Sequence, residues 1–307
     1  MKSYFRLMLG AKSIYAEQCF KESFIGADFG INQDLSMHLP EIWRDFNRKF
    51  IPVWQEVHPG KGKVAAGLAC GMLWTVCKGL NKGDIVLCPN GSNTYFFGEI
   101  GSDYYYKPGE ILPHRRDVAW HSHTIERSEM SPELQRSSGS IGTVSNITKY
   151  AEEIESLIGN QPIQTLISTD DTVEDPSVFA LEKHLEHFLV QNWKQTLLGK
   201  KYDLYKVDGE IIGQQFPTDT GYIDLLAISK DGKELLVIEL KRGRVSDVVV
   251  GQIQRYMGYI QEELLEQGQV VKGVIIALED DLKIRRALSV VNNIEFYKYQ
   301  VSFKLYQ

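Results

Sequence analysis

The sequence predicts an α+β domain followed by an α/β domain. Residues before about 149 are rich in glycine and aromatic residues, and turn signals separate their short strand patterns. After the acidic stretch STDDTVEDPS, helical and strand patterns alternate, an order typical of an α/β core. We therefore predict a first domain over residues 1–149, a helix and linker over 150–175, and a second domain over 176–307.

The composition indicates a soluble globular protein. Of the 307 residues, 43% are hydrophobic and 24% are charged, which is enough for two cores. No apolar run approaches the ~18 residues of a membrane span and no signal-peptide pattern is present, so we expect a cytoplasmic protein. The four cysteines form no C-x-x-C pair and are expected to be free, buried thiols. The net charge of −6 does not exclude nucleic acid, because a basic groove can exist within an acidic protein.

The segments of the first domain predict two helices, a sheet and a third helix in that order. AAGLACGMLWTVCKGL predicts an apolar helix, and KGDIVLCPNGSNTYFFGEIGSDYYY predicts the strands of a small twisted sheet or barrel. ITKYAEEIESLIG has helical spacing and predicts the helix before the linker. The first of the two helices, which precedes the apolar one, is predicted by HLPEIWRDFNRKFIPVWQEVHPG. Its pattern is amphipathic and is expected to bury Trp43, Phe46, Phe50 and Trp54.

The second domain begins with a predicted helix, and strands and helices then alternate to the C-terminus. The Asp-Gly pair in SKDGKE is a strong hairpin signal, so the strands on either side of it are expected to pair antiparallel. A final strand pair is expected at the C-terminus. The other predicted elements are a helix at 177–193, strands within 202–215, at 222–229 and at 234–241, a helix at about 246–267, a strand at 271–277 and a helix at 281–291.

Charged residues interrupt the two apolar strands of this hairpin. Asp224 lies in YIDLL, and Glu239 and Lys241 lie in LLVIELK. Because side chains alternate between the faces of a strand, Glu239 and Lys241 share one face, and Asp224 can lie across from them. Two carboxylates beside an ammonium predict a site for a hard divalent cation that acts on a phosphate. A surface ion pair on an edge strand is the alternative.

An aspartate followed fifteen residues later by E-x-K resembles the core of the PD-(D/E)XK nucleases. The run GYIDLLAISKDGKELLVIELKRGRVSDVVVGQIQRYMGYI is similar to the C-terminal domain of the NucS-type (EndoMS) DNA endonucleases, although the proline of the superfamily name is missing before Asp224. The resemblance implies an α/β nuclease core that binds Mg²⁺ or Mn²⁺, acts on DNA and forms a homodimer. It assigns catalysis to Asp224, Glu239, Lys241 and Gln252, and metal binding to Asp224, Glu239 and the backbone carbonyl of Leu240.

The resemblance also requires an acid on the helix before the sheet, and ALEKHLEHFLVQNW offers Glu182 and Glu186. At 100° per residue, Glu182 lies about 50° from the centre of the apolar stripe and Glu186 about 90° away. Glu182 also stands ten residues before Asn192, as in the NucS pattern. We therefore predict that Glu182 contributes to the metal site through a water, and that Glu186 is an ordinary solvated residue.

Basic residues near these carboxylates predict a surface that binds phosphates. Arg242 and Arg244 follow Lys241, and Arg255 lies in the next predicted helix. An acidic protein needs a local cluster of this kind to hold a polyanion. We therefore predict that Arg242, Arg244 and Arg255 contact DNA.

The residues from 82 to 144 are similar to the PUA/EVE-like modules of Mrr-type and other restriction-system proteins, through GDIV, GEI, DYYY and HRRDVAW. Domains of the wider PUA/SRA-like group often accept a flipped, modified base in an aromatic-lined pocket. The resemblance makes Arg115 and Arg116 available to phosphates. The alternative is that the aromatic residues are core residues of a small sheet. The implied base pocket consists of Trp74, Asn90, Ser92, Tyr95, Tyr104 and Trp120.

These features predict a metal-dependent DNA endonuclease of a restriction or phage-defence system. The first domain would select modified or distorted DNA, and the second would cut it. One alternative is mismatch or branched-DNA repair, as in NucS-type enzymes. Another is a nucleic-acid-binding module with an inactive nuclease fold, but the complete set of Asp224, Glu239 and Lys241 argues against it.

Overall fold

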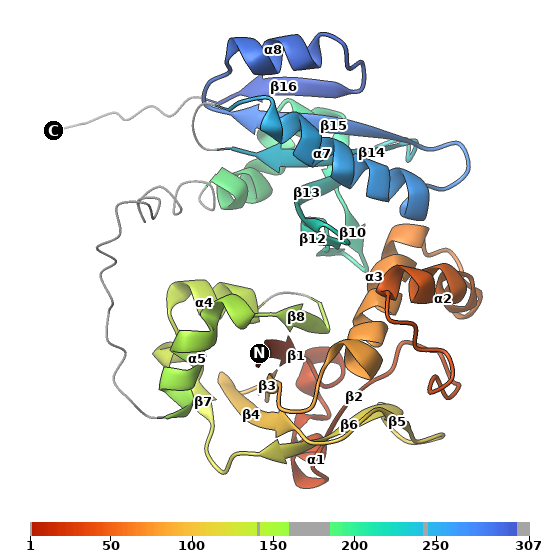
Figure 1. Ribbon diagram of the computed structural model, residues 1–307, viewed down its shortest axis with the longest axis vertical. Coiled ribbons are helices and arrows are strands. Elements are labelled where there is room, and N and C mark those ends of the chain that lie inside the picture. Colours follow the sequence, from red (N-terminus) through yellow and green to blue (C-terminus); the bar gives the residue numbers. More distant parts are fainter. Residues whose placement is uncertain (1, 140–141, 160–184, 242–244, 300–307) are drawn as a thin grey trace, which may run out of the picture. The chain divides into compact units, whose positions relative to one another are not determined.

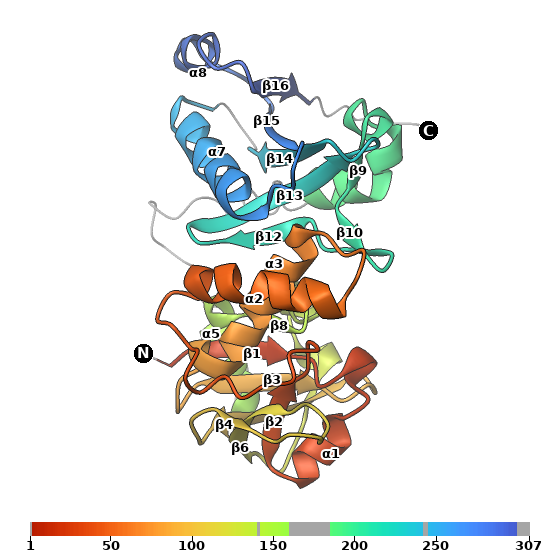
Figure 2. The same ribbon diagram turned by 90° about the vertical axis from the view of Figure 1, so that its right-hand side faces the viewer.

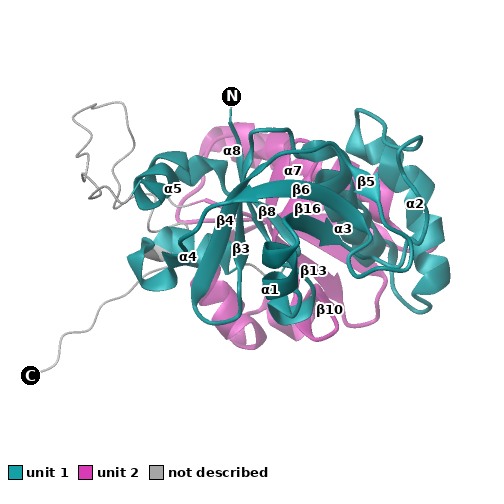
Figure 3. Cartoon of the chain, turned by 90° about the horizontal axis from the view of Figure 1, so that it is seen from below, with its two compact units in different colours: residues 1–166 teal, residues 167–307 magenta. Residues whose placement is uncertain are grey.

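The computed structural model describes residues 2–139, 142–159, 185–241 and 245–299. The chain divides into two compact units, Met1–Leu166 and Ile167–Gln307, which are coloured separately in Figure 3. We call them unit 1 and unit 2. The division falls within the segment 160–184, which lies outside the described residues, so the predicted domain boundaries at 149 and 176 stay predictions.

Unit 1 is built on an eight-stranded sheet whose main path runs β2-β6-β4-β3-β1-β8, with β5 paired to β6 and β7 paired to β4. Among the described residues, the end strands β2 and β8 each pair with a single neighbour, so the sheet is open and does not close into a barrel. The strands are β1 (Tyr4–Leu7), β2 (Phe24–Ala27), β3 (Ile85–Pro89), β4 (Thr94–Ile100), β5 (Tyr105–Tyr106), β6 (His114–Trp120), β7 (Ile125–Glu126) and β8 (Val144–Asn146).

Helices flank this sheet, with α4 and α5 on one side and α2 and α3 on the other (Figure 1). The amphipathic prediction for α2 is confirmed for Phe46, Phe50 and Trp54, which are buried, whereas Trp43 is half-buried. The α-helices are α1 (Ala16–Lys21), α2 (Trp43–Val57), α3 (Lys63–Trp74), α4 (Pro132–Ser138) and α5 (Ala151–Ile158). Shorter helical turns are η1 (Ala11–Ser13), the π-helical η2 (Thr75–Gly79), η3 (Arg127–Glu129) and η4 (Thr148–Tyr150).

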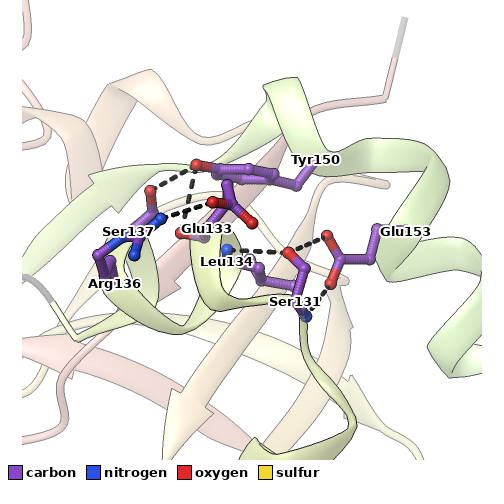
Figure 4. Close-up of polar contacts among 7 residues, drawn as sticks. All are labelled: Ser131, Glu133, Leu134, Arg136, Ser137, Tyr150 and Glu153. Carbon is purple, nitrogen blue, oxygen red and sulfur yellow. Dashed lines mark hydrogen bonds and ion pairs between the residues drawn. The ribbon is translucent and has the colours of Figure 1, made fainter. Parts of the chain in front are cut away.

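Polar contacts join α4 to the segment that leads into α5 (Figure 4). Ser131 is the N-cap of α4, and its hydroxyl donates a 2.8 Å hydrogen bond to Glu153 of α5. The hydroxyl groups of Tyr150 and Ser137 lie 2.8 Å apart. Ile154 of α5 is fully buried in the core of unit 1. The helix predicted to precede the linker is therefore packed into unit 1.

Unit 2 is built on a mixed six-stranded sheet with the path β12-β13-β14-β15-β16, and β9 pairs with β13. The predicted hairpin is confirmed, because β13 and β14 pair antiparallel, and α7 and α8 then connect the parallel strands β14, β15 and β16. The strands are β9 (Tyr202–Leu204), β10 (Lys206–Val207), β11 (Glu210–Ile211), β12 (Gln214–Thr218), β13 (Gly221–Ser229), β14 (Glu234–Leu240), β15 (Val270–Ala277) and β16 (Ile294–Lys298). The helices are α7 (Val248–Tyr259) and α8 (Leu282–Leu288), with η5 (Trp193–Gln195), η6 (Leu198–Lys200) and the π-helical η7 (Ile260–Leu264).

The two faces of the unit 2 sheet are covered by different helices (Figure 2). Leu225 of β13 and Ile238 of β14 belong to a core that includes Trp193 and Leu189, from the helical residues 185–195. The helix α7 packs against β14 and β15. Because neighbouring side chains in a strand point to opposite faces, Asp224 and Glu239 project away from the core that contains Leu225 and Ile238.

Two expectations from composition can be compared with this fold. The four cysteines are free and buried, as predicted, and burial raises the pKa of the Cys19 and Cys70 thiols to about 12. Among the residues that the structure describes, no helix has the length and apolar character to cross a membrane.

Candidate functional site

The two carboxylates of the predicted metal site lie across from each other on neighbouring strands. Leu225 pairs with Ile238, which places Asp224 of β13 directly across from Glu239 of β14. Asp224 Oδ2 accepts a 2.8 Å hydrogen bond from the backbone N–H of Leu240. Lys241 Nζ lies 2.7 Å from Glu239 Oε1, and the Glu239 side chain is almost fully buried. The structure therefore brings Asp224, Glu239 and Lys241 together, whereas a ligand role for the Leu240 carbonyl stays a prediction.

Glu186 is a third carboxylate at this site, and the expectation that it is solvated was wrong. Its side chain is buried and accepts 2.6 Å hydrogen bonds from the side-chain amides of Gln214 and Gln215. The helical wheel measured its angle from the apolar stripe, but it could not show that the flank of this helix meets the polar edge strand β12. Glu182, the acid that we predicted instead, lies outside the described residues.

Gln215 connects two of these carboxylates, and sequence reasoning missed it. Its Nε2 donates to Glu186 Oε2 at 2.6 Å and to Asp224 Oδ1 at 3.2 Å. It lies across from Asp224 in the β12–β13 ladder, and its φ is +48°, which is uncommon for a residue other than glycine. Such backbone strain is concentrated at functional sites. Pairing the strand QQFPT with GYIDLL across the intervening turn could have placed Gln215 beside Asp224.

The surroundings of Asp224 disfavour its negative charge, and metal binding at this site stays a prediction. Burial, followed by the nearby charge of Glu186, raises the pKa of Asp224 to about 6, although the hydrogen bond from Leu240 and the charge of Lys241 oppose this. Among the described residues, no three His, Cys, Asp or Glu side chains form a complete metal-binding group. The oxygen donors present are those of Asp224 and Glu239, with Glu186 near Asp224. Such carboxylate oxygens suit a hard divalent ion, whose remaining ligands would be water or phosphate.

Gln252 and Tyr256 lie on α7, near the start of β13. Gln252 Nε2 is 3.4 Å from the Tyr256 hydroxyl, and Tyr256 is buried, as we expected of a core residue. A Cβ added to Gly221 would lie 2.7 Å from that hydroxyl, and Gly221 has a φ of +143°. The glycine of the GYID motif is therefore required by the close approach of Tyr256, while the role of Gln252 at the metal-bound water stays a prediction.

The predicted DNA-binding arginines of unit 2 are only partly described. Arg255 is exposed on α7, where a phosphate could reach it. Arg242 and Arg244 lie outside the described residues, so the proposed cluster around Lys241 stays a prediction.

The arginines predicted to bind DNA in unit 1 are buried instead. Arg115 donates hydrogen bonds to the carbonyls of Leu112 and Ile111 and forms a 2.8 Å ion pair with Glu110. Arg116 donates to the carbonyls of nearby loops and is 3% exposed. Both lie on β6, an interior strand between β2 and β4, and although neighbouring side chains of a strand point to opposite faces, both arginines are covered. The expectation of an exposed phosphate-binding pair is therefore corrected.

The six residues predicted to form a base pocket do not share one cavity. Asn90 and Ser92 form an exposed turn, in which both the backbone and the hydroxyl of Ser92 donate to Asn90. Tyr95 is buried and contacts Ser138, and Trp120 donates to a backbone carbonyl of α1. Trp74 donates to the Pro40 carbonyl, and only Tyr104 lines the cavity of about 350 Å³ described below. Most of these aromatic residues serve the packing of unit 1, which was the alternative interpretation.

Comparison with protein families divides the chain in the same way as the fold. Residues 181–300 match the family model described as the endonuclease NucS C-terminal domain. Residues 5–148 match a model described as a domain of unknown function (DUF8426), so a PUA/EVE-like identity for unit 1 stays a prediction. No curated protein matches the chain.

Solved structures related to these endonucleases align with much of the chain but at low similarity. The repair endonuclease from Pyrococcus abyssi has 17% identity over 69% of this chain and 66% of its own, just under two thirds, with a TM-score of 0.32. A complex of EndoMS with double-stranded DNA has 14% identity over 70% of this chain and 68% of its own, with a TM-score of 0.32. EndoMS in its apo form has 15% identity over 70% and 67%, with a TM-score of 0.31. The similarity to nucleases therefore rests on the sequence match: residues 181–300 resemble the C-terminal domain of NucS endonucleases.

Proposed function

We propose that the protein is a metal-dependent DNA endonuclease whose phosphodiester hydrolysis takes place in unit 2. The observation that carries this proposal is that Asp224 and Glu239 lie across from each other on neighbouring strands, with Lys241 Nζ 2.7 Å from Glu239 Oε1. The match of residues 181–300 to the NucS C-terminal domain supports the same reaction and the same substrate class.

The side chains at this site have distinct proposed roles. Asp224 and Glu239 would hold Mg²⁺ or Mn²⁺, with Glu186 adding negative charge nearby. A bound ion of this kind polarises the phosphate and lowers the pKa of a coordinated water. Lys241 would stabilise the negative charge that develops on the phosphate oxygens. Gln215 keeps the carboxylates of Glu186 and Asp224 oriented by donating a hydrogen bond to each.

We propose that unit 1 selects the DNA that unit 2 cuts. A restriction or phage-defence enzyme would require unit 1 to favour a modified base. The alternative, a repair endonuclease, is favoured by the NucS match in unit 2 and would require a preference for mismatched or branched DNA. A homodimer would supply two nuclease sites, one for each strand.

Cleavage of end-labelled duplexes tests the nuclease proposal. Plain, methylated, hydroxymethylated and mismatched duplexes are incubated with Mg²⁺, Mn²⁺ or EDTA. We expect cleavage only with metal, and a loss of at least about 100-fold in the Glu239→Gln variant, because mutations at groups that act as a unit abolish most activity.

The matched control is Glu279→Gln, which changes an exposed carboxylate of the same unit and should cleave as the wild type does. A folded protein that cuts none of the duplexes with either metal would favour the inactive binding module. Faster cleavage of a modified duplex indicates restriction, and faster cleavage of a mismatched duplex indicates repair.

A further inference from the structure

A cavity of about 350 Å³ opens in unit 1, and its lining residues all belong to that unit. Its walls come from the loop before α2, from η2 and the turn after it, and from the region between β4 and β6. Three lining side chains are cationic and one is a carboxylate. We call it the Arg116 cavity, and its lining includes Ser36, Lys78, Lys82, Asp103, Tyr104 and Arg116.

Arg116 brings a buried positive charge to this cavity. Its Nε donates to the Ser102 carbonyl at 2.9 Å and its Nη1 donates to the Leu80 carbonyl at 2.8 Å. Among the described residues, its Nη2 has no hydrogen-bond partner and its guanidinium has no carboxylate within ion-pair distance. Only 3% of Arg116 is exposed, and burial lowers its pKa. Because a buried charge is costly unless it is paired, the remaining nitrogen is suited to an anion in the cavity.

Two lysines add positive charge that a ligand can recruit. Lys78, in the π-helical turn η2, lies 2.7 Å from Glu41, and Lys82 lies 2.7 Å from Asp103. The two carboxylates are 86% and 84% exposed, and ion pairs at such exposure contribute little. An anion that enters the cavity can therefore attract both ammonium groups at small cost.

Tyr104 supplies a flat aromatic wall. Its hydroxyl accepts from the Leu35 N–H at 3.1 Å and lies 3.0 Å from His114 Nδ1, while His114 Nε2 lies 2.7 Å from the Ile31 carbonyl. Since Nε2 must donate to that carbonyl, Nδ1 accepts from Tyr104. The hydroxyl is thus held by Leu35 and His114, and the ring is the part of Tyr104 that we expect a ligand to contact. The same bonds fix the segment that carries Ser36, so the cavity is preformed.

We propose that the Arg116 cavity binds a single nucleotide unit, with its phosphate at Arg116, Lys78 and Lys82 and its base against Tyr104. The volume lies within the range of small-molecule sites and is far larger than a phosphate alone requires. The nucleotide can be a free molecule or one extruded from a DNA strand. This inference rests on the proposed function only in taking DNA as the source in the second case.

Binding to the full-length protein in EDTA tests the proposal without any contribution from cleavage. The probes are the four 2′-deoxynucleoside 5′-monophosphates, deoxyadenosine, orthophosphate, a plain duplex and a duplex with one unpaired nucleotide, all titrated calorimetrically at one salt concentration. Lys78→Glu and Lys82→Glu should each weaken binding at least tenfold. Lys21→Glu, which reverses an exposed lysine of α1, should leave binding unchanged.

The base contact has its own pair of variants. Tyr104→Leu removes the ring and should weaken binding strongly, whereas Tyr104→Phe retains the ring but loses the bonds to Leu35 and His114, so it should bind more weakly than the wild type and more tightly than Tyr104→Leu. Thermal unfolding of each variant confirms that unit 1 is folded. Arg116 itself is not replaced, because it also holds backbone carbonyls.

Each outcome decides between the possibilities. Monophosphate binding that depends on Lys78 and Lys82 supports a free-nucleotide site, and dependence seen only with the unpaired-nucleotide duplex supports an extruded nucleotide. Orthophosphate binding as tight as that of the monophosphates overturns the base contact, and no dependence on the two lysines with any probe overturns the site. Cleavage of the plain duplex by the wild-type protein with Mg²⁺ is measured in parallel. An absence of cleavage would count against the nuclease proposal and leave the binding result intact.

Discussion

The environment of Asp224 destabilises the charged form of its carboxyl group. Burial and the charge of Glu186 raise its pKa to about 6, from an ordinary value near 4. The folded protein therefore holds this proton more tightly than the unfolded chain does. The free energy of unfolding falls as pH rises from about 4 to about 6, and the loss remains at higher pH. At about 1.4 kcal/mol for each pKa unit, the cost of ionising Asp224 is on the order of 3 kcal/mol at neutral pH.

The first prediction concerns replacement of this charge. Asp224→Asn keeps an acceptor for the Leu240 N–H but removes the buried charge, so it should raise the melting temperature in EDTA more at pH 7.5 than at pH 4.5. It should also abolish metal-dependent cleavage. Calorimetric unfolding at the two pH values measures the difference, and Glu279→Gln serves as the exposed control. Equal shifts at both pH values would show that the folded protein does not destabilise the Asp224 charge.

Gln215 provides a second prediction at the residue scale. Gln215→Gly tolerates a φ of +48° but removes the hydrogen bond that lowers the pKa of Asp224. The acid limb of the cleavage profile should therefore move to higher pH, and more metal should be needed for half-maximal rate. Gln214→Ala, which loses a hydrogen bond to Glu186 alone, should move the limb less. If the two variants have the same pH profile, Gln215 has no special role in positioning Asp224.

At the scale of elements, the start of β13 depends on its contact with α7. The Tyr256 hydroxyl occupies the space that a side chain at Gly221 would need, and Gly221 has a φ of +143°. Replacement of a glycine at an incompatible φ destabilises by more than about 1 kcal/mol. The first residue of the GYID motif is therefore set by packing between a strand and a helix.

A third prediction separates the two causes of this requirement. Gly221→Ala should lower the free energy of unfolding by more than about 1 kcal/mol. Adding Tyr256→Phe, which removes the hydroxyl, should recover part of that loss in a double-mutant cycle measured by urea unfolding. Complete failure to recover would assign the whole cost to the backbone. Gly251→Ala on α7 is the control, because its Cβ would meet nothing within 4 Å and should stabilise the helix.

The elements also show which features the sequence could predict. The pairing of β13 with β14 followed from local signals, because the Asp-Gly turn sets the hairpin and side-chain alternation sets the faces. The burial of Glu186 was not predictable in this way, because it depends on where a distant helix meets β12. The positive φ of Gln215 was not predictable either, because glutamine is not a residue type that marks such a backbone conformation. In unit 1, the charges of Arg115 and Arg116 suggested a surface, whereas carbonyls from separate loops surround both in the fold.

At the scale of the whole molecule, unit 2 carries the candidate nuclease site, and each of the two units has its own hydrophobic core. One such site cuts one strand, so a double-strand break requires two copies. We therefore expect a homodimer on DNA. This expectation comes from the chemistry of a single site and from the NucS resemblance.

A fourth prediction tests the dimer through mixed assemblies. Co-expression of the wild type with differently tagged Asp224→Asn, followed by purification through both tags, yields dimers with one active copy. These should nick a supercoiled plasmid but not linearise it, while the wild-type dimer linearises it. Analytical ultracentrifugation on DNA gives the stoichiometry. A monomer that makes clean double-strand breaks would contradict the prediction.

The position of the four cysteines gives the molecule an internal reporter of opening. All four are buried and lie between residues 19 and 88, so unit 2 carries none. A thiol reagent such as Ellman's reagent can react only when unit 1 opens, so the reaction rate measures the transient exposure of that unit while unit 2 remains silent. A nucleotide bound in the Arg116 cavity should slow the colour change, because ligands that bind the folded state suppress its opening. The thiol reaction therefore follows the opening of unit 1 by itself, within the intact chain.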